Sequence, residues 1–250
     1  MRVLASLILI ALTSPAVAQE TAPLPRDRPE PVAEEPMVPL PRERPKVEAT
    51  AAPADEIVPE IPAPRIYQAA CPAVLTGAVE ARMLEPIAQG TCGGRSPLAV
   101  TAVLVNGRMV PLSNEATINC AMASVMPEWA AAIDGYLKAR ENTRLARIVI
   151  GTSYYCRARN NVVGGELSEH GFANALDVIG FELEDGRMMA LPEGWDDPLA
   201  PAGRLLRFAH DAGCARFTTT LGPEANALHA DHLHLDLGCH GERCVARLCE

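Results

Sequence analysis

Apolar residues in the C-terminal three quarters of the chain fall into short runs separated by turn residues, with two longer stretches at helical spacing. The first runs are Ala99–Val105 (AVTAVLV) and Met109–Leu112 (MVPL), with Asn106-Gly107 between them. Asn-Gly readily supplies the two positive φ angles of a tight turn, so this pattern predicts a β-hairpin.

Two stretches are typical of α-helices. The longer is Thr117–Arg140, whose apolar residues recur every three or four positions at Met122, Val125, Trp129, Ala132, Ile133 and Tyr136. Pro127 is expected to start a new segment or to kink this helix, because proline lacks the backbone donor and its ring clashes with the preceding turn. Pro201–Ala212 predicts a shorter helix that ends at Gly213.

Further apolar runs predict the remaining strands. A turn at Glu184-Asp185-Gly186 is expected to join two of them into a pair. The runs are Leu145–Ser153, Asn174–Phe181, Met188–Leu191, Arg216–Leu221 and His232–Leu237. Strands interleaved with few helices indicate an α+β fold with an antiparallel central sheet and flanking helices.

The N-terminal quarter has a different composition. Residues 1–18 combine a charged start, an apolar run and Ala16-Val17-Ala18, which is the pattern of a cleaved export signal. Residues 19–65 are rich in proline and charge and repeat PLPRDRP as PLPRERP, which predicts an extended linker without a core of its own. We therefore expect one folded domain over residues 66–250.

Eight cysteines in a chain with an export signal predict disulfide bonds and a periplasmic or secreted location. They are Cys71, Cys92, Cys120, Cys156, Cys214, Cys239, Cys244 and Cys249. Proximity in the sequence suggests Cys71–Cys92 and Cys244–Cys249 as two of four pairs, among the many pairings that eight cysteines allow.

Charge and hydropathy limit the partners. The net charge of −9 argues against nucleic acid, because binding to phosphates depends on clustered lysine and arginine. No stretch after the signal approaches the roughly 20 apolar residues of a membrane span. The oligomeric state is left open.

Candidate chemistry gathers in two separate stretches. In HLHLDL, strand alternation places His232, His234 and Asp236 on one face and three leucines on the other. In SEHGFANALDV, Asp177 faces away from its apolar neighbours, and His170 precedes this strand. One carboxylate and two imidazoles, with a fourth position for water, are typical of a catalytic zinc site. Zinc in such a site polarises a carbonyl and lowers the pKa of bound water.

The motifs themselves resemble known families. SEHGFANALD is similar to the S-x-H-x-x-G-x-A-x-D pattern of the LAS metallopeptidases, with Ala173 in place of the glycine, and HLH is similar to their closing H-x-H. The order YCRARN, SEHGFANALDVIGF, DHLHLDLG resembles more specifically the bacterial extensin-like C-terminal domain family. The likeness covers about residues 66–250 and implies a disulfide-braced fold of the LAS type.

The resemblance also implies roles for single residues. His170, Asp177 and His234 would bind zinc, and His232 would be the general base. Asp231 is the alternative base, since other members place a glutamate at that position. Ser168 would support the loop. Arg157 matches an arginine that relatives place near the substrate, where it would polarise the scissile carbonyl or stabilise the oxyanion.

These observations predict an exported zinc metallopeptidase that acts on peptide bonds in peptidoglycan stems or cross-links, as an endopeptidase or a carboxypeptidase. The first alternative is a protein that retains zinc for stability, binds the cell wall and has no turnover. The second is a structural envelope protein in which the proline-rich linker is the functional part.

Overall fold

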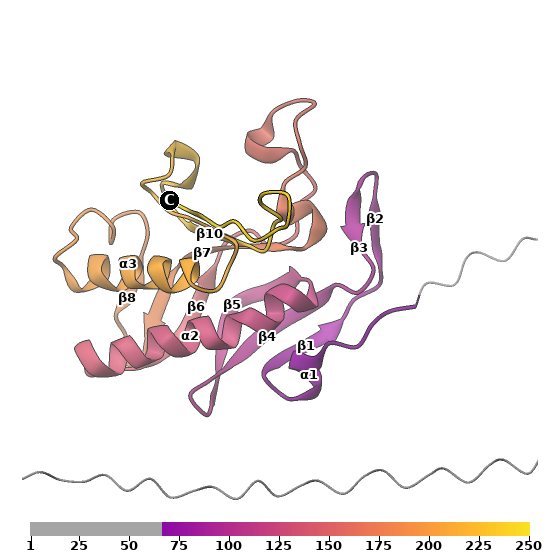
Figure 1. Cartoon of the computed structure of the whole chain (residues 1–250). Coiled ribbons are helices and arrows are strands. Elements are labelled where there is room, and N and C mark those ends of the chain that lie inside the picture. The colour runs from indigo at the N-terminus through magenta and orange to yellow at the C-terminus, as the bar shows by residue number, and fades with distance from the viewer. Residues whose placement is uncertain (1–66) are drawn as a thin grey trace, which may run out of the picture. The chain divides into compact units, whose positions relative to one another are not determined.

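Most of the chain is organised around one large β-sheet (Figure 1). The computed structural model describes residues 67–250. The signal predicted for residues 1–18 and the linker predicted for 19–65 lie outside this part. None of the described helices has the length and apolar character needed to cross a membrane.

The elements follow one another in a fixed order. They are α1 (Pro72–Leu75), β1 (Val79–Met83), β2 (Ile87–Gln89), β3 (Cys92–Gly94), β4 (Leu98–Val105), β5 (Arg108–Ile118), α2 (Cys120–Arg140), β6 (Leu145–Ile150), the 3-10 helices η1 (Arg159–Asn161) and η2 (Glu169–Phe172), β7 (Ala175–Leu183), β8 (Met188–Ala190), α3 (Pro201–Cys214), β9 (Thr219–Leu221), the 3-10 helix η3 (Ala227–His229), β10 (Leu233–Asp236) and β11 (Leu248–Cys249).

The α+β class is confirmed, but the sheet is mixed rather than wholly antiparallel. Its strand order is β1-β4-β5-β6-β7-β10-β9-β11, with β8 also paired to β7. Strands β5 and β6 run parallel, as do β9 and β11, and the other pairs are antiparallel. Parallel neighbours need a long crossover, and α2 supplies it between β5 and β6.

The predicted hairpin is confirmed: Asn106 and Gly107 both have positive φ, 47° and 83°, and join β4 to β5. The helix predicted from Thr117 begins later, because β5 continues to Ile118 and the Asn119 side chain then accepts a hydrogen bond from Met122 N as the N-cap. One helix runs through Pro127, so the prediction of a new segment there is wrong. Its buried face continues on both sides of the proline, and this packing outweighs the lost hydrogen bond.

Helices α2 and α3 pack against each other and against the sheet (Figure 1). Trp129 of α2 is fully buried between Phe181 and Phe217, and its indole N–H donates to the carbonyl of Ala209 in α3 at 2.9 Å. The indole therefore links both helices to Phe181 of β7, the strand that also carries Asp177.

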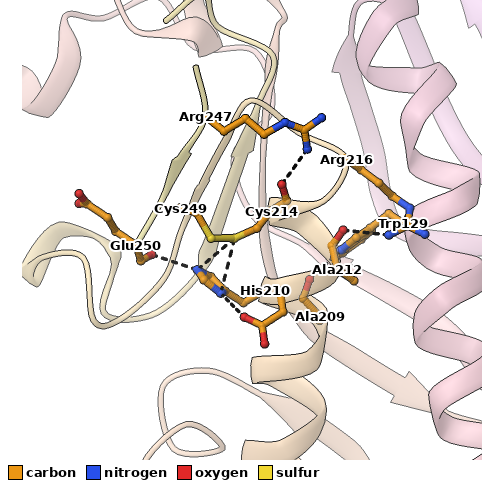
Figure 2. Close-up of a disulfide and its surroundings, with 10 residues drawn as sticks. Trp129, Ala209, His210, Ala212, Cys214, Arg216, Arg247, Cys249 and Glu250 are labelled. Carbon is orange, nitrogen blue, oxygen red and sulfur yellow. Dashed lines mark hydrogen bonds and ion pairs between the residues drawn. A yellow bond between two sulfur atoms is a disulfide. The ribbon is translucent and has the colours of Figure 1, made fainter. Parts of the chain in front are cut away.

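All eight cysteines form disulfides, as predicted, but both suggested pairs are wrong. The bonds are Cys71–Cys120, Cys92–Cys156, Cys214–Cys249 and Cys239–Cys244. Three of the four bonds join cysteines 35 to 64 residues apart, because the fold brings distant segments together, and only Cys239–Cys244 joins near neighbours. Figure 2 shows Cys214–Cys249, which attaches the C-terminal strand β11 to the end of α3.

Candidate metal centre

His170 is held by a short turn just before β7. This turn is η2. It ends at Ala173, whose φ of 52° is in the left-handed region that favours glycine. Alanine holds this conformation only at a cost in backbone strain. Gly171 has close neighbours: a Cβ there would lie 2.8 Å from Cys92 Sγ.

Asp177 and His234 stand directly opposite each other on neighbouring strands, β7 and β10. Their flanking residues Leu176, Val178, Leu233 and Leu235 are fully buried in the core, so the predicted alternation is confirmed. The register alone therefore places the carboxylate beside the imidazole, and two neighbouring backbones fix both.

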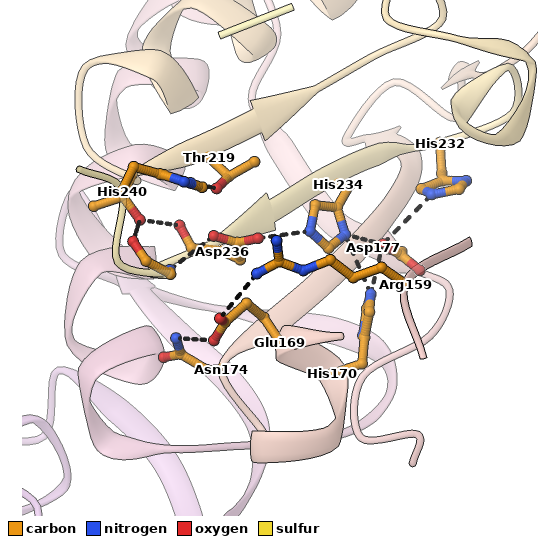
Figure 3. A network of polar contacts seen from close by, with 12 residues as sticks. Arg159, Glu169, His170, Asn174, Asp177, Thr219, His232, His234, Asp236 and His240 are labelled. Carbon is orange, nitrogen blue, oxygen red and sulfur yellow. Dashed lines mark hydrogen bonds and ion pairs between the residues drawn. The ribbon is translucent and has the colours of Figure 1, made fainter. Parts of the chain in front are cut away.

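Three atoms from the two stretches converge at one point (Figure 3). Asp177 Oδ1 lies 3.0 Å from His234 Nδ1 and 3.2 Å from His170 Nε2. The two ring nitrogens are also 3.2 Å apart. Ligands about 2.0 Å from a tetrahedral metal are about 3.3 Å from one another. The spacing thus fits three ligands on one face of a single ion, and all three residues are buried.

The outward-facing ring nitrogens are also bonded. His170 Nδ1 lies against the carbonyl oxygen of Ser153, and His234 Nε2 is 2.9 Å from Asp236 Oδ2. Both acceptors require a hydrogen on those nitrogens. The lone pairs that can bind a metal are therefore on His170 Nε2 and His234 Nδ1, which face Asp177. Such partners behind metal-binding histidines fix the ring orientation and tautomer.

The electrostatics favour a cation at this point. Burial would raise the pKa of Asp177, but hydrogen bonds from His170 and His234 hold it well below its usual range. Burial would lower the pKa of His234, but its bonds to Asp177 and Asp236 raise it to about 9. A buried carboxylate and two imidazole lone pairs need a proton or a metal ion between them. This donor set of two nitrogens and one oxygen fits Zn²⁺, so His170, Asp177 and His234 would hold it.

Zinc binding should release a proton from His234. Because the pKa of this group is about 9 in the metal-free protein, zinc affinity should rise about tenfold per pH unit up to about pH 9 and then level off. The raised pKa also means that the proton stabilises the metal-free fold below pH 6.5, and that this stabilisation is lost as pH rises through 9. Competition titrations with a chromophoric chelator from pH 6 to 10 measure the slope. A flat profile between pH 6.5 and 9 contradicts it.

Asp236 bonds to the His234 ring on the side away from the three converging atoms, and strand alternation predicted only that it shares a face with His234. It is buried, and its Oδ1 accepts from Gly238 N at 2.8 Å while Oδ2 accepts from the imidazole. Asp236→Asn should weaken zinc binding 10- to 100-fold, the usual effect of losing such a partner. The same chelator titration measures it, and an unchanged zinc Kd would exclude a supporting role for this carboxylate.

One side of the centre opens into a cavity of about 300 Å³. Arg157 lines it, and no ion pair in residues 67–250 involves this guanidinium, which donates one 3.5 Å hydrogen bond to the Ala158 carbonyl. Ser168 is buried and also lines the cavity, and its backbone N–H donates to Arg157 O. Its predicted supporting role stays a prediction. His229, His232 and His240 also line the cavity.

His232 lies just outside β10 rather than in the strand, because the strand begins at Leu233. The ring still faces the centre: its Nε2 is 3.5 Å from Asp177 Oδ1. Its Nδ1 is 2.8 Å from the exposed carboxylate of Asp231, which therefore holds the Nδ1–H form and leaves the Nε2 lone pair toward the cavity. Asp231 faces solvent and lies behind the imidazole, away from the three converging atoms.

His229 is one of four imidazoles that line the cavity, with its ring centroid 5.3 Å from that of His232 and 5.7 Å from that of His234. Asn226 Oδ1 bonds its Nδ1 at 2.9 Å. Burial, with the nearby charges of His234 and His232, lowers the pKa of His229 to about 4. It therefore stays neutral at physiological pH. No spacing in the sequence marks this residue, since η3 carries it outside the strand pattern.

A second group, His210, Cys214 and Cys249, also brings metal-binding residue types together in the described part of the chain (Figure 2). Its two sulfurs are bonded to each other, and His210 Nε2 contacts the Glu250 carbonyl. Disulfide sulfurs are poor metal ligands compared with thiolates, so this group is a structural tie.

Comparison with known proteins gives one positive result. The family described as Extensin-like protein C-terminus matches residues 69–250, which is well over half of the chain. The match includes every residue of the converging group and of the cavity described above. Neither a curated protein sequence nor a solved structure matches the chain.

Proposed function

Because this chain belongs to the extensin-like protein C-terminus family, and its matched region contains the converging His170, Asp177 and His234, we propose that it is a zinc metallohydrolase. Its substrate would be the peptide part of peptidoglycan, in stems or cross-links. The observation that carries the proposal is the 3.0–3.2 Å triangle of donor atoms at the edge of an open cavity.

The ligand set supports zinc and a catalytic rather than a structural site. Two imidazoles and one carboxylate from the protein leave room for a further ligand, whereas structural zinc sites are closed by four protein ligands. All eight cysteines are in disulfides, so none is free to close the site. Bound zinc supplies Lewis acidity toward a carbonyl and a water of lowered pKa.

His232 is placed to accept a proton at the cavity side of the centre. Its Nε2 faces the site, and Asp231 orients the ring through Nδ1. A base with one nitrogen held by a carboxylate and the other toward the substrate is the arrangement that general-base catalysis requires. In this assignment Asp231 positions His232, and it is not the base itself.

Arg157 supplies positive charge on the same cavity wall. Its guanidinium is half-buried and has no carboxylate partner in the described part of the chain, so it is available to a substrate oxygen. A fixed cation near the scissile carbonyl stabilises the negative charge that develops during hydrolysis. The guanidinium can also bind a peptide carboxylate in two-point contact.

The substrate class rests on motif resemblance to the LAS metallopeptidases, which include murein endopeptidases and D-alanyl-D-alanine dipeptidases. The cavity volume of about 300 Å³ is at the lower end of ligand sites and suits a short peptide segment. Four disulfides are typical of proteins that work in an oxidising compartment, which supports action in the periplasm or outside the cell. The proline-rich segment would then space the domain within the envelope.

Digestion of purified peptidoglycan tests the proposal. The zinc-loaded chain should produce new termini within stem or cross-link peptides, identified by mass spectrometry of the released muropeptides. Chelation should stop the reaction and added zinc should restore it, while a zinc-free His170→Ala variant stays inactive. An unchanged muropeptide profile with fully zinc-loaded protein contradicts the proposal.

A further inference from the structure

Residues 151–157 connect β6 to the turn region without regular secondary structure, yet they supply two groups to the site. The Ser153 carbonyl contacts His170 Nδ1, and Arg157 lines the cavity. A segment with few backbone hydrogen bonds of its own needs other attachments to hold such groups in place.

Hydrogen bonds tie the segment to β5, to β7 and to the residues that carry His170, and its one covalent attachment comes from the separate β2–β3 hairpin. Cys156 is bonded to Cys92 at the start of β3, and the Tyr154 hydroxyl donates to Gln89 Oε1 at 3.0 Å. Figure 1 shows this hairpin projecting beside the main sheet rather than belonging to it. The hairpin thus holds the segment from outside.

The same disulfide also lies against the turn that carries His170. A Cβ on Gly171 would come within 2.8 Å of Cys92 Sγ and 3.9 Å of Cys156 Cα. Next to Cys156 in the chain, Tyr155 N donates to the carbonyl of His170 at 3.3 Å. One sulfur bridge therefore touches both the ligand turn and the segment that orients the ligand.

We propose that the Cys92–Cys156 disulfide positions the metal centre, by holding His170 and the Ser153–Arg157 segment in the geometry that binds the ion. The proposal rests on the metal site of the proposed function and adds its dependence on one disulfide. Reduction of this bond by a thiol reductant consumes two electrons and two protons, leaves two thiols, and releases the segment from the hairpin. Metal affinity then falls.

Neither cysteine of the Cys71–Cys120 disulfide is among the atoms nearest to Gly171. Cys71–Cys120 joins the start of α1 to the start of α2, and neither cysteine lines the cavity. It spans 49 residues, close to the 64 of Cys92–Cys156, so removal of either bond should release a similar amount of chain entropy. Cys71–Cys120 is therefore a matched control for general loss of stability.

The experiment compares two double variants in the full chain, Cys92→Ala/Cys156→Ala and Cys71→Ala/Cys120→Ala. Zinc Kd is measured by chelator competition at a temperature where circular dichroism shows both to be folded. The first should bind zinc about 10- to 100-fold more weakly than the wild type, the range for loss of support behind a ligand. The second should stay within about threefold, with a comparable fall in Tm.

Gly171→Ala adds a readout that a purely structural role would not change. In the wild type, the new methyl group meets the sulfur and should weaken zinc binding. In the Cys92→Ala/Cys156→Ala background the sulfur is gone, and the nearest remaining atom is the Cβ of residue 92 at 3.6 Å, an ordinary contact. The same substitution should therefore cost little zinc affinity there, which is a measurable coupling between the two sites.

The outcomes separate the two proposals. If the wild type binds zinc and the Cys92→Ala/Cys156→Ala variant binds it within threefold, the positioning role is overturned while the metal centre stands. Additive effects of Gly171→Ala in both backgrounds overturn it as well. If the wild type binds no zinc, the proposed function fails and the positioning role fails with it.

Discussion

Asp177→Asn should lower the zinc affinity of the chain by at least about 100-fold, more than loss of a carboxylate that only holds a ligand histidine in place does. The substitution keeps the shape of the side chain and removes the only negative charge among the three converging groups. A neutral amide oxygen is a much weaker zinc ligand than a carboxylate, and the two imidazoles alone make an incomplete site. Chelator competition and metal content after dialysis measure the effect.

Asp211→Asn is the control for this substitution, because Asp211 is exposed and lies on α3 away from the centre. It should leave zinc binding unchanged. Equal zinc affinities for Asp177→Asn and the wild type would show that the ion binds elsewhere or that the carboxylate takes no part.

His232→Ala should lower kcat for muropeptide hydrolysis by about 10²- to 10⁴-fold while the zinc content stays at the wild-type level. The expected loss follows from the position of His232 Nε2 at the cavity side of Asp177, outside the group of three ligand atoms. Initial rates on a purified muropeptide, with metal content measured on the same sample, test both parts.

Asp231→Asn provides a graded comparison, since it removes only the carboxylate behind the ring. It should lower kcat less than His232→Ala and should leave zinc Kd unchanged. If His232→Ala retains full activity, His232 is not the base. If the wild type binds zinc tightly but cleaves nothing, the chain is better described as a zinc-stabilised wall-binding protein.

Local sequence patterns predicted the elements that depend on neighbouring residues. The Asn106-Gly107 hairpin, the strand pair of β7 and β8, and the helix that begins at Pro201 follow from turn chemistry and apolar spacing, which act over a few residues. The bounds were less accurate. β6 ends at Ile150 rather than at Ser153, because the chain leaves the strand there and the Ser153 carbonyl turns to His170.

Features that depend on the path of the whole chain were not predictable in this way. The parallel pairing of β5 with β6 requires knowing that α2 crosses back over the sheet. The partner of Cys92 lies 64 residues away in sequence, since the β2–β3 hairpin reaches the segment before η2. Such contacts are set by tertiary packing, which a local pattern does not encode.

In the candidate site, too, some features follow from local patterns and others depend on the path of the whole chain. Alternation within each strand predicted that Asp177 and His234 face away from their apolar neighbours, and motif likeness joined them with His170 into one ligand set. The distance between Asp177 and His234 follows from the antiparallel register of β7 with β10, which places the two residues opposite each other. The carbonyl of Ser153 and the position of His229 come from irregular segments, where no periodic signal exists.

Anomalous X-ray scattering at the zinc absorption edge, from crystals of the zinc-loaded protein, tests the central claim most directly. We expect one strong peak about 2.0–2.2 Å from His170 Nε2, Asp177 Oδ1 and His234 Nδ1. A peak bound only by other side chains, or no peak in this triangle under saturating zinc, would contradict it.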